Sequence, residues 1–112
     1  MNTKDMADTV YRVDKFIVPS ESRDVFLERL RHIQAFLREQ PGCVEDVILE
    51  QTGGPGRFNI VTIVIWENPQ VAETARAVAA EQYKREGFNP AELMSQLGIT
   101  ADMAAYADVT KA

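Results

Sequence analysis

The segment from Phe58 to Trp66 constrains the fold more than any other part of the sequence. Only two of its nine residues, Asn59 and Thr62, are polar, and its β-branched side chains favour a strand. Side chains alternate between the two faces of a strand, and here both alternate sets are mostly apolar. Both faces therefore need cover. We expect the chain's own helices on one face and a second copy of the protein on the other.

Length and charge limit the classes of protein that this chain represents. A chain of 112 residues corresponds to one domain, which we place at residues 9–112, after a disordered tail at residues 1–8. The net charge of −5, without a basic cluster, argues against nucleic acid as a partner. The polar N-terminus and the lack of a long apolar run predict no signal peptide and no membrane span. The single cysteine, Cys43, fits a reducing, cytoplasmic location.

Glycines, prolines and apolar periodicity divide the chain into elements. Phe26, Leu30, Ile33 and Leu37 form the apolar stripe of a first long helix, capped by Ser20 or Ser22. Asn68 and Pro69 begin a second helix, in which we assign Val71, Ala75, Val78 and Gln82 to the inner face. The predicted strands are Val10–Val18, Val44–Gln51, Phe58–Trp66 and Asp102–Val109, and the predicted helices are residues 21–40, Pro69–Arg85 and Ala91–Leu97.

This order of elements predicts an α+β fold. It corresponds to a ferredoxin-like βαββαβ arrangement, in which helices cover one face of a four-stranded antiparallel sheet. The other face of the Phe58–Trp66 strand stays apolar and open in a monomer. A patch of that kind usually marks an interface, so we expect a homodimer that forms through the sheet face.

The motifs along this fold resemble a known family. Gln40-Pro41-Gly42-Cys43 follows the first helix, and a variable loop then leads to the strand that ends in Trp66-Glu67-Asn68. In this order they resemble the antibiotic biosynthesis monooxygenase (ABM) domain, a dimeric α/β barrel, over residues 10–109. The family includes cofactor-free oxygenases of polycyclic phenols, enzymes that open haem, and a signal-molecule isomerase.

The haem-opening branch of that family uses three residues: an asparagine on the first strand, a tryptophan on the third and a histidine on the second helix. Trp66 matches the tryptophan, and Asp14 and Lys15 lie near the asparagine position. The second predicted helix contains no histidine. We therefore do not expect haem degradation.

Several side chains are candidates for a pocket that binds a small aromatic ligand. The resemblance implies that Trp66 forms a wall for a flat substrate; otherwise this residue is a core or rim aromatic. His32, the only histidine, is either a surface residue or a general base, since its ordinary pKa of about 6.5 suits proton transfer. Arg29 is then the group that stabilises a substrate anion. Further wall and orienting candidates are Phe36, Phe16, Tyr83 and Gln82, the last of which is otherwise a residue near solvent at the helix end.

The function that the resemblance implies is oxidation of an aromatic or polyketide-like phenol by O₂, without metal or flavin. With one histidine and one cysteine, the chain has no metal-ligand spacing, and we expect no cofactor. Two alternatives stay open. One is a ligand-binding or stress-related module without turnover, and the other is an isomerase that acts on a small molecule.

Overall fold

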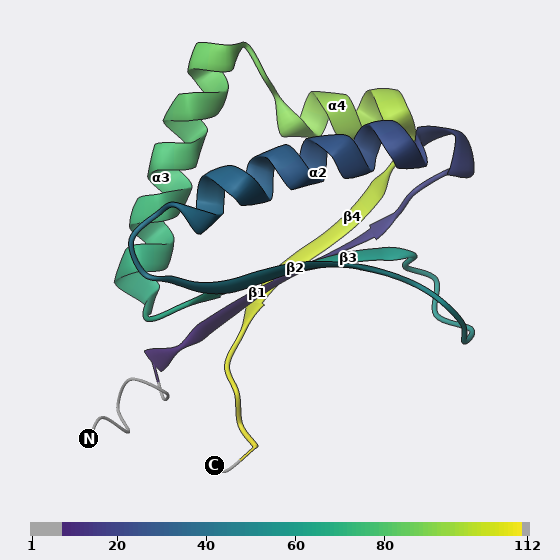
Figure 1. The fold of residues 1–112 in the computed structure, drawn as a ribbon. Coiled ribbons are helices and arrows are strands. Elements are labelled where there is room, and N and C mark those ends of the chain that lie inside the picture. The colour runs from purple at the N-terminus through teal and green to yellow at the C-terminus, as the bar shows by residue number, and fades with distance from the viewer. Residues whose placement is uncertain (1–7, 111–112) are drawn as a thin grey trace.

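The computed structural model describes residues 8–110 as two layers, an antiparallel sheet with helices on one face (Figure 1). Apart from Asp8, the predicted tail at residues 1–8 lies outside the described residues. The arrangement confirms the predicted fold class. In chain order the elements are β1 (Val10–Ile17), a 3₁₀ turn η1 (Ser20–Ser22), α2 (Arg23–Arg38), β2 (Cys43–Glu50), β3 (Ile60–Trp66), α3 (Pro69–Glu86), α4 (Pro90–Leu97) and β4 (Thr100–Tyr106).

The strands lie in the order β2-β3-β1-β4, so β3 and β1 form the centre of the sheet. Along β3, every second side chain from Ile60 to Trp66 is buried under the helices. Val61, Ile63 and Ile65 point to the opposite face and are half-buried. The helices cover only one of the two apolar faces that the sequence predicts (Figure 1).

Two strands, β3 and β4, differ from their predicted bounds by more than one residue. β3 begins at Ile60 instead of Phe58, because the side chain of Asn59 pairs with the backbone of Val18 through two hydrogen bonds of 2.8 Å. β4 ends at Tyr106 instead of Val109, since Tyr106 pairs with Tyr11 near the start of β1.

The helices begin and end near the predicted capping and helix-breaking residues, with one exception. Asn68 caps α3 by accepting a hydrogen bond of 2.9 Å from the Val71 amide, as predicted. Ser22 stands at the N-cap position of α2 but makes no side-chain cap. Its buried hydroxyl instead donates to the Leu97 carbonyl at 2.7 Å, and this bond ties the end of α4 to the start of α2.

The inner face of α3 also differs from the prediction. Val78 is 41% exposed, whereas Ala75 and Ala79 are buried against the sheet. Of the predicted inner face, Ala75 is buried and Val71 packs against its cluster, as predicted. Ala79 takes the place of Val78, because alanine lets the helix backbone lie closer to its neighbours than valine does. Side chains as short as alanine also leave space beneath the helix.

Charged pairs fasten α2 over the edge strand β2. Arg23 donates to both carboxylate oxygens of Glu50, at 2.6 and 2.8 Å, and Arg38 donates to both oxygens of Asp46, at 2.9 Å each. Bidentate pairs of this kind restrict the relative orientation of the two side chains as well as the distance between them. They fix both ends of α2 relative to the sheet.

Candidate functional site

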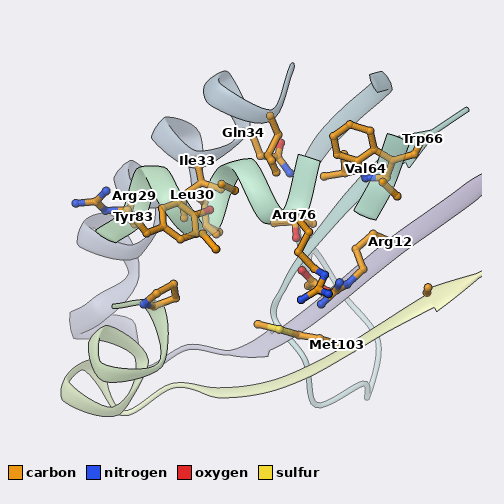
Figure 2. Close-up of a pocket in the computed structure, with 18 of the residues that line it drawn as sticks. Arg12, Arg29, Leu30, Ile33, Gln34, Val64, Trp66, Arg76, Tyr83 and Met103 are labelled. Carbon is orange, nitrogen blue, oxygen red and sulfur yellow. The ribbon is translucent and has the colours of Figure 1, made fainter. Parts of the chain in front are cut away.

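A cavity of about 680 Å³ lies between the sheet and the helices (Figure 2). This volume falls within the range of small-molecule sites, roughly 300 to 1,000 Å³. Most of its wall is apolar. Its floor comes from β1, β3 and β4, and its roof from α2, α3, α4 and the turn before α4; the floor residues are Val10, Arg12, Asp14, Phe16, Thr62, Val64, Trp66, Met103 and Ala105.

The cavity interrupts the hydrophobic core. One buried cluster gathers around Phe16, Phe26 and Ile60, and a separate one gathers around Val64, Trp66 and Ala75. A domain of this size normally packs one continuous core. Here the polar side chains of β1 and β3 lie along the floor between the two clusters, which makes this gap the candidate site.

The strand register brings those polar side chains together. Asp14 of β1 pairs with Thr62 of β3 on one side and with Met103 of β4 on the other. Directly paired residues point to the same face of a sheet. Arg12, two residues before Asp14, shares that face, and its Nε donates to Asp14 Oδ1 at 2.9 Å. Within residues 8–110, Asp14 Oδ2 accepts no hydrogen bond and stays available to a ligand.

Asp14 is the carboxylate that the cavity perturbs most. Its side chain is 22% exposed. Burial raises the pKa of Asp14 above its usual value, and this effect outweighs the opposing influence of the Arg12 guanidinium. A carboxylate with a raised pKa holds a proton more strongly and is a better general base.

Two further polar groups face the cavity with spare hydrogen-bonding capacity. Gln34 of α2 is 3% exposed, and its Nε2 donates to the Val47 carbonyl at 3.3 Å, which leaves its own carbonyl oxygen free. Thr62 is 5% exposed, and its hydroxyl makes no hydrogen bond with another side chain among residues 8–110. Buried polar groups normally find partners, so both are placed to bind a ligand atom.

An aromatic group closes another part of the cavity. The Arg29 guanidinium stacks 4.0 Å from the Phe88 ring centroid, and the rings of Tyr83 and Phe88 meet edge to face at 5.3 Å. Burial, together with the nearby Glu86 carboxylate, raises the pKa of Tyr83, although Arg29 opposes the shift. Tyr83 therefore stays a neutral hydrogen-bond donor at physiological pH.

The residues predicted for the site divide into two groups. Trp66, Phe16, Tyr83 and Arg29 all line the cavity. The other three are not among the lining residues. His32 is 62% exposed, with its Nε2 3.7 Å from Glu86 Oε2; Gln82 bonds Glu86 and Arg85; and Phe36 is half-buried on another face of α2.

The sequence-based list lacks several polar residues of the cavity: Arg12, Asp14, Gln34, Thr62, Glu73 and Arg76. A signal for three of them was present in the sequence. Gln34 falls within the apolar stripe of its helix, between Leu30 and Leu37, and the strand period places Arg12 and Asp14 on one face. Asp14 lies on β1, which is a central strand of the sheet.

Between residues 8 and 110, no group of three or more His, Cys, Asp or Glu side chains is placed to hold a metal ion. Over the same range, no helix has the length and apolarity that crossing a membrane requires.

Solved structures share this fold. The chain is 26% identical to SnoaB, a cofactor-independent oxygenase from Streptomyces nogalater, with a TM-score of 0.61 over 91% of this chain and 94% of that one. A conserved protein from Methanosarcina mazei is 15% identical, with a TM-score of 0.69 over 94% and 97% of the two chains. The heme-degrading protein of Mycobacterium tuberculosis is 16% identical, with a TM-score of 0.55 over 61% and 77%.

The sequence comparisons agree with this likeness. No curated relative matches the chain. Residues 9–85, which are more than half of the chain, match the antibiotic biosynthesis monooxygenase family. The protein therefore belongs to the antibiotic biosynthesis monooxygenase family.

Proposed function

We propose that the protein is a cofactor-independent monooxygenase that oxidises a small, flat phenol in the cavity beneath α2 and α3. One observation carries the proposal. Asp14, a carboxylate with a raised pKa and one free oxygen, lies on the floor of an otherwise apolar cavity beside a guanidinium. A general base next to a cation is what the ionisation of a bound phenol requires.

The first step is proton transfer. The phenolic hydroxyl approaches Asp14 Oδ2, and its proton passes to this carboxylate. The negative charge moves from Asp14 to the phenolate oxygen, so the total charge of the cavity does not change. Arg12 keeps an anionic neighbour throughout, since its terminal nitrogens have no partner among residues 8–110 and can donate to the phenolate.

The second step is the reaction of the phenolate with O₂. The ring carbon opposite the phenolate oxygen forms a bond to one oxygen atom, which gives a hydroperoxide on that carbon after the second oxygen takes a proton. The hydroperoxide then loses water as its O–O bond and the C–H bond of the same carbon break. The products are a quinone and one water molecule. Phenol and O₂ together supply every atom and electron, so no external reductant is required.

The walls of the cavity suit a flat ring. Trp66, Phe16 and Met103 provide apolar surface on the floor. Gln34 and Thr62 offer hydrogen bonds to a second oxygen substituent, and the neutral Tyr83 hydroxyl offers one from the roof. These side chains orient the substrate, and the apolar walls exclude water from the anion. The predicted roles of His32 as base, Phe36 as wall and Gln82 as orienting residue stay predictions, while the geometry favours Asp14 for the base.

The relatives support this type of chemistry. SnoaB is described as a cofactor-independent oxygenase. Heme degradation is the described function of another structural neighbour. We do not extend that function to this chain, because its segment from Pro69 to Glu86 contains no histidine.

We further propose a homodimer that forms through the open face of the sheet, in the cytoplasm. On that face lie Val13, Val47, Leu49, Ile63 and Ile65, none of which is buried within one chain. Covering them with a second sheet removes this apolar surface from water. The free thiol of Cys43 fits a reducing compartment.

Oxygen uptake tests the proposal. Purified protein is mixed with a panel of naphthols and anthrones, and O₂ consumption is compared with quinone formation. We expect one O₂ consumed per quinone for at least one compound, and tighter binding by the wild type than by Trp66→Phe. Binding without uptake across the whole panel would favour the ligand-binding module instead.

A further inference from the structure

The charge balance of the cavity wall differs from that of the whole chain. The chain has 12 basic and 17 acidic residues, but three arginines and only two acidic residues line the cavity. Each of the three arginines has a carboxylate neighbour: Glu86 for Arg29 at 3.7 Å, Asp14 for Arg12 at 2.9 Å and Glu73 for Arg76 at 2.7 Å. Arg12 and Arg76 are distinguished by where their side chains meet and by the donors that they leave unused.

Arg12 and Arg76 reach the cavity from opposite layers. Arg12 comes from the sheet and Arg76 from α3, and their side chains extend toward the same part of the cavity (Figure 2). Like charges that converge in this way repel each other, and an anion placed between them relieves the repulsion.

Both guanidiniums keep unused donors. Among the described residues, Arg12 uses only its Nε, to bond Asp14, and both of its terminal nitrogens remain unused. Arg76 uses Nε and one terminal nitrogen to bond Glu73, at 3.3 and 2.7 Å, which leaves the other terminal nitrogen. The planar guanidinium donates paired hydrogen bonds to carboxylates better than any other side chain does.

We propose that the natural substrate is an aromatic compound that carries a carboxylate, and that this carboxylate binds between Arg12 and Arg76 while the ring enters the apolar cavity. The proposal rests on the proposed function, because it places the ring where the phenol is oxidised. It adds the substrate class and assigns Arg76 as a specificity-determining residue.

Calorimetry with three naphthalene probes tests the proposed carboxylate site between Arg12 and Arg76. The probes 2-naphthoate and 2-naphthamide have the same shape and differ in charge, and 2-naphthol reports on phenol binding alone. We expect the wild type to bind the carboxylate about tenfold more tightly than the amide, since charged hydrogen bonds are stronger than neutral ones. Arg76→Gln should remove most of this preference and leave 2-naphthol binding unchanged. Arg76 is 68% exposed, so the variant should fold.

Arg85→Gln is the matched control, since Arg85 lies on the same helix and does not line the cavity. It should keep the full preference for the carboxylate. Equal binding of 2-naphthoate and 2-naphthamide by the wild type would overturn the proposed carboxylate site. An equal loss of affinity for these two probes in Arg76→Gln would do the same. In either case the proposed function stands if 2-naphthol still binds. Failure of all three probes to bind would overturn both proposals.

Discussion

Arg12 and Asp14 lie two residues apart on β1, and their side chains meet at 2.9 Å on the floor of a cavity with mostly apolar walls. The contact does not fully compensate for burial of the carboxylate, since the pKa of Asp14 is raised in spite of Arg12. A structural ion pair would normally lower that pKa. The arrangement is therefore suited to proton transfer more than to stability.

Replacing Asp14 with Asn should abolish most of the turnover and keep binding. The amide has the shape of the acid but cannot accept the phenolic proton. We expect kcat to fall by about 100-fold or more, the range over which general bases act, while the Kd for 2-naphthol changes little. Oxygen uptake and calorimetry measure the two quantities. Asp24→Asn, an exposed acid on α2, is the control and should match the wild type; equal losses in kcat and affinity would contradict the assignment.

The stability of the protein should depend on pH through the same residue. Because the pKa of Asp14 is higher in the folded than in the unfolded state, the folded protein binds this proton more tightly. The contribution of Asp14 to stability is present below its unfolded pKa of 3.8, and it is lost as the pH rises through its folded pKa. Asp14→Asn should therefore be at least as stable as the wild type at pH 7. Thermal unfolding from pH 4 to pH 7 measures this; a variant that loses stability as the pH rises, relative to the wild type, would refute it.

His32→Ala separates the two candidates for the base. If His32 is the base, as the sequence suggested, its removal should slow oxidation far more than it weakens binding. The exposed position of His32 beside Glu86, outside the cavity lining, favours the opposite result, a kcat within about twofold of the wild type. Single-turnover rates of the His32→Ala and Asp14→Asn variants decide between them.

Ile63→Asp should break the proposed dimer. Ile63 is at the centre of the open sheet face, and a carboxylate buried there without a partner is strongly unfavourable. Sedimentation should give a mass near 12.6 kDa for the variant and twice that mass for the wild type. Val78→Asp makes the same change on an exposed part of α3 and should stay dimeric. A monomeric wild type at micromolar concentration would rule the dimer out.

Gly42→Ala should destabilise the fold. Gly42 has a φ of +88°, and an added Cβ would lie 2.5 Å from a Val71 side-chain carbon. Strained backbone and overlap each contribute about 1 to 3 kcal/mol, so we expect a loss of roughly 2 kcal/mol or more. Gly53→Ala is the control, because open space surrounds Gly53, and it should change stability by less than about 0.5 kcal/mol. Chemical denaturation measures both variants.

The sequence by itself determined which segments form the strands and helices of the two layers. The period of two along Phe58–Trp66 identified a strand with two apolar faces, and Asn68-Pro69 marked the start of α3, because these signals come from residues close together in the chain. Trp66 and Tyr83 both line the cavity, and each lies in an element whose type the local pattern specified.

The tertiary structure alone decided which polar side chains share the site. Asp14 lies opposite Thr62 because of the register between β1 and β3, which depends on backbone pairing across 48 residues of sequence and not on local propensity. The rotation of each helix about its axis decided which of its side chains face the cavity. Gln34 faces the cavity and His32 faces solvent, because close packing of α2 and of the alanines of α3 against the sheet selects the angle at which each helix lies.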